Sequence, residues 1–134
     1  MSKPRYPWWG YVRSMVYRYP ALRDQHDAAM LMQTTPAYSG MSGGGGDGRG
    51  LENLVLRALT RNEAREYEAV AAAIRQTDEA ANGALKLRMI RLVYWDRSHT
   101  LTGAAMALHI GEATAWRWHG VFIRQVARNF GLLD

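Results

Sequence analysis

The sequence lacks cysteine and contains no long hydrophobic run. Without cysteine the chain forms neither disulfides nor thiolate metal sites, which is typical of proteins in a reducing cytosol. No segment approaches the ~18 apolar residues of a membrane-spanning helix. The basic start also has no apolar stretch followed by a small-residue cleavage site. We therefore expect a soluble, cytoplasmic protein.

Signatures of catalysis and of metal binding are also missing. The histidines have neither HExxH spacing nor cysteine partners, and so predict no metal site; they are His26, His99, His109 and His119. The glycine-rich residues 39–50 lack the Gly-Lys-Ser/Thr of a phosphate-binding loop, and no strand-like run precedes them. No serine or carboxylate pair stands in a recognisable nucleophile context. We expect no enzymatic activity and no cofactor.

Basic charge is concentrated at the two ends of the chain. The formal net charge is +5 over 134 residues. Residues 1–20 hold four basic side chains and no acid, and residues 85–134 hold seven basic side chains against three acids. Residues 51–80 hold six acids against four arginines. This distribution suits an anionic partner that touches both ends.

Glycine and proline divide the chain into three parts. Residues 39–50 cannot sustain a helix or a packed strand, so they predict a flexible linker. Residues 1–38 form a basic, aromatic segment, with a short helix expected from Pro7 until Pro20 interrupts it, and a second helix over residues 21–33. Residues 51–134 form a helical domain. We interpret the aromatic segment as a homodimer surface, with a second DNA contact as the alternative.

Helices are predicted throughout residues 51–98. The first covers residues 51–59, and the second, over residues 61–77, begins with a capping box of Thr60 and Glu63. The apolar stripe of the second helix consists of Tyr67, Val70, Ala71 and Ile74. The third helix follows residues 82–83 and is expected to bury Leu85, Met89, Leu92 and Val93. With no strand predicted, the chain is expected to be an all-α, small helical bundle.

Residues 100–127 have the pattern of a helix-turn-helix. Small Ala104 and Ala105 stand where the second helix would cross the first, and Ile110 is expected to tuck under the turn at residues 109–111. His109 takes the turn position usually given to glycine, because the backbone there is left-handed. This pattern is typical of a DNA-binding unit.

Trp116 and Trp118 are expected to lie in different environments. Residues two apart on a helix point about 200° away from each other. Trp118 is expected in the core, aligned with Ala115, Phe122 and Val126. Trp116 is expected at the flank of the exposed face.

A basic ridge on the second helix supplies the candidate DNA contacts. Arg124 and Arg128 each fall within about 20° of Arg117 on the helical wheel. The start of such a helix approaches base edges. The expected base-reading residues are Glu112, Ala113, Thr114, Trp116, Arg117 and Gly120. The expected contacts to the DNA backbone are Arg88, Arg91, Arg97, Arg124 and Arg128.

Residues 87–133, "LRMIRLVYWDRSHTLTGAAMALHIGEATAWRWHGVFIRQVARNFGLL", resemble the C-terminal helix-turn-helix of sigma factors. Together with "YEAVAAAIRQT" before them, they resemble the small phage-encoded regulators of the RinA and ArpU type. The similarity covers roughly residues 51–134 and is strongest over residues 85–132. It implies a phage or prophage transcription regulator that binds double-stranded DNA and activates late genes together with bacterial RNA polymerase.

A second class of DNA-binding protein shares the helix-turn-helix. The terminase small subunit recognises viral DNA for packaging and assembles into a ring. This chain has no obvious segment after the second helix for building such a ring. We therefore favour the transcription regulator and keep the terminase small subunit as the alternative.

Overall fold

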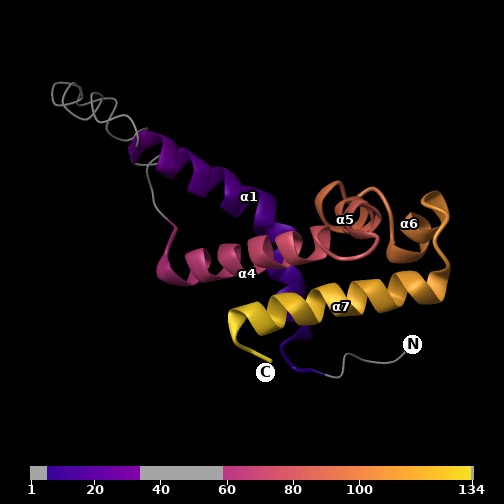
Figure 1. The fold of residues 1–134 in the computed structure, drawn as a ribbon. Helices are drawn as coiled ribbons and strands as arrows, with labels where there is room; N and C mark the ends of the chain where they lie inside the picture. Colours follow the sequence, from indigo (N-terminus) through magenta and orange to yellow (C-terminus); the bar gives the residue numbers. More distant parts are fainter. Residues whose placement is uncertain (1–5, 34–58, 134) are drawn as a thin grey trace, which may run out of the picture.

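The computed structural model describes residues 6–33 and 59–133, and these residues are all-helical (Figure 1). The elements are α1 (Trp9–Gln33), α4 (Arg61–Asp78), α5 (Gly83–Ile90), the π-helix η2 (Arg91–Trp95), α6 (Leu101–Ala107) and α7 (Glu112–Phe130). The predicted all-α class is confirmed. The predicted linker and the predicted helix at residues 51–59 lie outside the described residues, apart from the last position. No helix in the described ranges is long and apolar enough to cross a bilayer.

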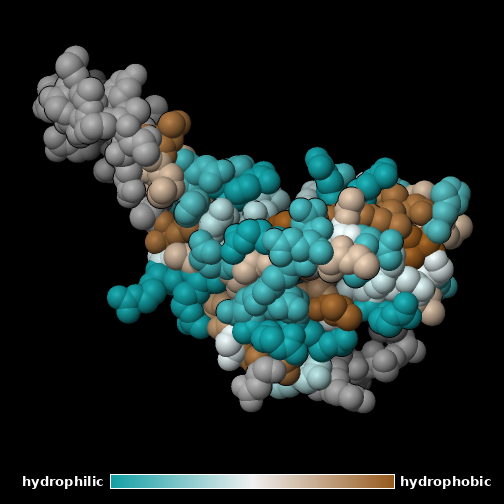
Figure 2. Space-filling model, in the orientation of Figure 1, coloured by the Kyte–Doolittle hydropathy of each residue, from teal (hydrophilic) through white to brown (hydrophobic). Residues whose placement is uncertain are grey.

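The helices α4 and α7 lie side by side, and α1 crosses behind them (Figure 1). The shorter helices α5 and α6 lie toward one end of this arrangement, and the C-terminal half of α1 projects away from it. Hydrophilic side chains cover most of α4 in Figure 2, whereas a hydrophobic area lies over α6 at the right.

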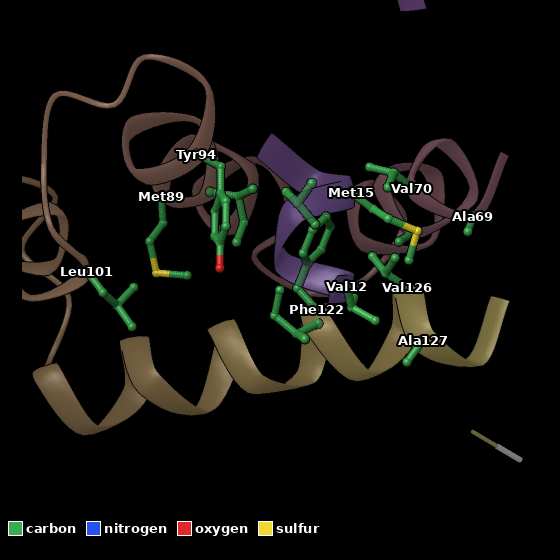
Figure 3. Close-up of a cluster of buried hydrophobic side chains, with 14 of the residues drawn as sticks. Val12, Met15, Ala69, Val70, Met89, Tyr94, Leu101, Phe122, Val126 and Ala127 are labelled. Atoms are coloured by element: carbon green, nitrogen blue, oxygen red, sulfur yellow. The ribbon is translucent and has the colours of Figure 1, made fainter. Parts of the chain in front are cut away.

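The core lies along α7 and is built from all the other elements (Figure 3). Met89, Tyr94 and Leu101 face the first half of α7, and Val12 and Met15 of α1 face its second half. Val12, Met15 and Val16 of α1 are therefore used within the chain's own core, whereas Met30 near the end of the helix is exposed. Homodimer formation through this segment stays a prediction.

Helix α1 runs through Pro20 without ending, so the predicted division into two helices is wrong. Proline has no N–H, so it leaves the carbonyl of the residue four positions earlier without its helical donor. That carbonyl belongs to Val16, and it accepts a hydrogen bond from Trp95 Nε1 at 2.8 Å. A side chain from η2 thus replaces the missing backbone donor. The helix also begins at Trp9, not at Pro7.

The capping box of α4 is confirmed. The Glu63 amide donates to the Thr60 hydroxyl at 3.1 Å, and the Thr60 amide donates to the Glu63 carboxylate at 2.9 Å. Of the predicted apolar stripe, Val70 and Ala71 are buried, and the larger Tyr67 and Ile74 are half-buried. The stripe therefore faces the core as expected.

The predicted buried face of the third helix is correct only at Met89. Leu85, Leu92 and Val93 are half-buried, and the buried partners of Met89 are Ile90 and Tyr94. The cause is η2, in which the Asp96 amide donates to the carbonyl of Arg91 five residues earlier. A π-helical turn contains one residue more than an α-helical turn, so the residues after it that face the core are shifted along the sequence. Tyr94 is therefore buried where an unbroken α-helix would bury Leu92 and Val93.

Candidate nucleic-acid interface

A short turn joins α6 to α7 and fixes the angle between them. His109 has φ 58°, the left-handed conformation predicted from its position. The His109 amide donates to the Met106 carbonyl and the Ile110 amide donates to the Ala105 carbonyl, which together form a Schellman motif. Ile110 is half-buried against the core. The turn thus ends α6 and starts α7 within four residues.

The contact between α6 and α7 uses the small residues found in the sequence. Ala104 and Ala105 are buried, as is Ala115 on α7, so the two backbones approach closely. The Thr102 hydroxyl donates to the Glu112 carboxylate at 3.1 Å and ties the first turn of α7 to α6. These contacts hold the two helices as one unit.

The buried face of α7 is centred on His119, not on a tryptophan. The residues that share this face are Ala115, Phe122, Ile123, Val126 and Ala127. At about 100° per residue, Trp116 and Trp118 lie on opposite flanks of it. Trp116 is 42% exposed, and Trp118 is only half-buried, with the Lys86 ammonium 5.4 Å from its ring centre. The prediction that Trp118 lies in the core is therefore wrong.

The expected base-reading residues do not share one environment. Glu112, Ala113, Trp116 and Arg117 are exposed, and Thr114 is half-buried. Gly120 is buried under the Arg124 guanidinium. A Cβ added at Gly120 would lie only 3.2 Å from Nη1 of Arg124. Gly120 is therefore the one expected base-reading residue that is buried, and it belongs to the lining of the groove described below, between α1 and α7, and not to the exposed side of α7.

Arg117 occupies the centre of the outward side of α7. On the helical wheel it lies about opposite the centre of the buried face. No ion pair involves Arg117 in the part of the chain that the structure describes. Its guanidinium therefore remains available for an external partner.

The expected DNA-backbone contacts are distributed over several elements. Arg88 is exposed on α5, and Arg91 is exposed on η2 with its Nε 3.6 Å from an Asp96 carboxylate oxygen. Arg128 is exposed on the last turns of α7. Only Arg97 and Arg124 are brought together, because both line one groove.

This groove has a volume of about 1130 Å³ and lies between the start of α1, the η2–α6 connection and α7. Its cationic residues are Arg13, Arg97 and Arg124, and its aromatic residues include Tyr6, Trp9, Tyr17 and Trp116. No acidic residue belongs to the lining that the structure describes. The sequence did not predict this groove, because α1 supplies one wall from about 90 residues away.

A hydrogen-bonded triad of Arg13, Tyr94 and His119 lies at the groove: Arg13 and His119 belong to its lining, and Tyr94 is fully buried beneath them. Arg13 Nε donates to the Tyr94 hydroxyl at 2.8 Å, and the Tyr94 oxygen lies 2.7 Å from His119 Nε2. The Tyr94 oxygen accepts from Arg13, and among the described residues His119 Nε2 is the only acceptor within reach of the buried phenol proton. Tyr94 therefore donates to Nε2, and the His119 ring is neutral. Burial lowers the pKa of His119 to about 4 and raises the pKa of Tyr94 to about 12. No sequence pattern predicted this hydrogen-bonded triad, because its three residues come from α1, η2 and α7.

No protein-family model, curated protein or solved structure matches this chain.

Proposed function

We propose that the chain is a sequence-specific DNA-binding protein that uses α6 and α7 as a helix-turn-helix. The observation that carries this proposal is the outward side of α7. Arg117 projects from it without an ion-pair partner among the described residues, and α6 holds α7 in place. The Schellman turn at His109 and the bond from Thr102 to Glu112 support it, because both fix how α7 is presented.

In the proposed complex, the first turns of α7 enter the major groove. Ala113 is small enough to allow close approach, and Arg117 carries the planar fork that pairs with guanine O6 and N7. Arg88 and Arg128 are proposed to contact phosphates. The role in the cell, activation of late phage genes together with bacterial RNA polymerase, is proposed from the resemblance to phage regulators.

The proposal is tested by selecting bound duplexes from a random DNA pool and then measuring affinity by fluorescence anisotropy. Arg117→Ala should weaken binding to the selected site about 5- to 150-fold, which corresponds to the ~1–3 kcal/mol of one bidentate base contact. It should also relax the preference at one base pair. Arg128→Ala should weaken selected and random duplexes alike and lower the salt dependence by about one phosphate contact.

Arg75→Ala is the matched control, since Arg75 is an exposed arginine on α4, outside the proposed unit. It should leave both affinities unchanged. Failure of the unmutated chain to enrich or bind any duplex at low salt would overturn the proposal. Light scattering on the same sample distinguishes a small regulator from a ring-shaped assembly, which would favour the terminase small subunit.

A further inference from the structure

We propose that the groove between α1 and α7 is a binding site for a nucleoside phosphate, separate from the outward side of α7. The shared chemistry is a planar base carrying a phosphate. Its source is either a free nucleotide or an unpaired nucleotide of a DNA strand, and the experiment below separates the two.

Three arginines, Arg13, Arg97 and Arg124, line this groove, and no carboxylate belongs to its described lining. The Arg97 guanidinium lies 4.7 Å from the Tyr17 ring centre, and the Arg13 guanidinium lies 5.9 Å from the same centre. Neither arginine forms an ion pair with any residue in the described ranges, and the same is true of Arg124. Cations held close to one ring repel each other, so a phosphate between them would relieve that repulsion.

His119 adds a hydrogen-bond donor to the groove. Its side chain is 6% exposed and lines the groove, and its Nε2 accepts from Tyr94. In neutral histidine the proton then resides on Nδ1. Nδ1 has no hydrogen-bond partner among the described residues. Every fully buried side-chain nitrogen or oxygen in these residues does have a partner. Nδ1 is therefore not fully buried, and it reaches the open space beside the ring. A buried donor left open to a cationic groove is suited to an anionic or carbonyl oxygen.

Aromatic rings flank this donor on two sides. Trp9 of α1 and Trp116 of α7 both meet the His119 ring edge-on, with centroid distances of 6.2 Å in each case. Both indoles also line the groove, and Trp116 is 42% exposed. Exposed aromatic faces beside arginines are the usual means of binding unpaired bases. Inorganic phosphate would use the cations alone, so the aromatic walls favour a ligand that carries a base.

The polar contacts of the groove are consistent with this ligand. The Thr100 hydroxyl accepts from the Gly103 amide at 3.0 Å and keeps its own proton available. Glu112 accepts from Thr102, a residue of the lining, but is not itself part of the lining. Arg124 is half-buried over Gly120, so its guanidinium is already placed at the wall.

The test is calorimetric titration of the full chain at low salt with dAMP, deoxyribose 5-phosphate and inorganic phosphate. The base should make dAMP bind at least about fivefold more tightly than deoxyribose 5-phosphate, because base–aromatic stacking contributes ~1–3 kcal/mol per base. Trp116→Leu should remove most of this advantage. Arg124→Gln should weaken dAMP and deoxyribose 5-phosphate by a similar factor of at least about five. Thermal melts establish that both variants are folded.

Arg75→Gln is the matched control and should change the dAMP affinity less than about twofold. Equal binding of dAMP and inorganic phosphate, or equal losses in Arg124→Gln and Arg75→Gln, would overturn the proposal. A short single-stranded oligodeoxyadenylate separates the sources: tighter binding than dAMP supports a DNA strand, and weaker binding supports a free nucleotide. Binding of a selected duplex without binding of dAMP or the oligonucleotide would refute this proposal alone, and the reverse result would refute the proposed function alone.

Discussion

The Tyr94 hydroxyl donates to Nε2 of His119 across 2.7 Å in the interior of the bundle, and its oxygen points toward α7 in Figure 3. Each group satisfies the hydrogen-bonding requirement of the other, because a buried phenol needs an acceptor and a buried neutral imidazole nitrogen needs a donor. Arg13 then donates to the same phenol from α1. This pair therefore connects the elements that surround the groove.

Lowering the pH should destabilise the protein through His119. The pKa of His119 is about 4 in the folded chain because of burial and the nearby Arg13, compared with 6.5 ordinarily. Between these values the unfolded chain binds a proton that the folded chain does not, so the free energy of unfolding falls as the pH falls from 6.5 to about 4. The loss is on the order of 3 kcal/mol. Urea denaturation across this pH range measures it.

The His119→Gln variant provides the comparison for that experiment. It removes the titrating group, so its free energy of unfolding should change much less between pH 6.5 and pH 4.5. Glu66, whose pKa is lowered chiefly by Arg18 and Tyr11 against the effect of burial, adds its own loss only at lower pH. Parallel curves for the variant and the unmutated chain would refute the role of His119.

Replacing Tyr94 with phenylalanine should cost about 1–3 kcal/mol of unfolding free energy, because it leaves His119 Nε2 without its donor inside the core. The ring volume is nearly unchanged, so the loss reports the hydrogen bonds and not packing. Urea denaturation at pH 7 measures it. Tyr6→Phe is the control, because Tyr6 lines the groove and its hydroxyl has no hydrogen-bond partner among the described residues. A similar loss in both variants would contradict the prediction.

Trp95→Phe should destabilise the chain by about 1–3 kcal/mol, because it leaves the Val16 carbonyl without a donor. Pro20→Ala restores a backbone N–H to that carbonyl. The loss from Trp95→Phe should therefore be smaller when Pro20→Ala is also present. A double-mutant cycle of unfolding free energies measures this coupling, and additive effects would show that the indole does not compensate for the proline.

Phe122→Ala should cost more stability than Trp118→Ala, although tryptophan is the larger residue. Phe122 is 3% exposed, whereas Trp118 is half-buried at the edge of the core. Complete burial makes truncation of an aromatic side chain cost about 3–5 kcal/mol. Thermal melts of the two variants, with Trp116→Ala as the more exposed reference, provide the ranking. An equal or larger loss for Trp118→Ala would reverse the assignment of the α7 face.

Two glycine-to-alanine substitutions should have opposite effects. Gly83 is buried at the start of α5, where an added Cβ would collide with the carbonyl oxygens of Thr77 and Asp78. Gly83→Ala should therefore destabilise the chain by about 1–3 kcal/mol. Gly10 of α1 has open space around it, and Gly10→Ala should stabilise by up to about 1 kcal/mol through helix propensity. Calorimetric melting temperatures distinguish them, and a stabilising Gly83→Ala would contradict the packing.

Local patterns in the sequence determined the features that depend on neighbouring residues. The capping box of Thr60 and Glu63 and the left-handed His109 follow from contacts within a few positions, so the sequence predicted both correctly. The buried alanines of the α6–α7 contact were also predictable, since only small residues allow two helices to cross closely. The exposure of Arg117 followed from helical periodicity.

Tertiary structure decided the features in which a distant residue changes a local preference. Pro20 would end an isolated helix, but Trp95, 79 residues further along the chain, supplies a donor to the Val16 carbonyl, and α1 continues. Periodicity favoured Trp118 as the core residue of α7, whereas Tyr94, turned inward by η2, gives His119 the partner that allows a polar ring to be buried there. The groove exists only because α1 packs beside α7, a contact between residues far apart in the chain that no local pattern specifies.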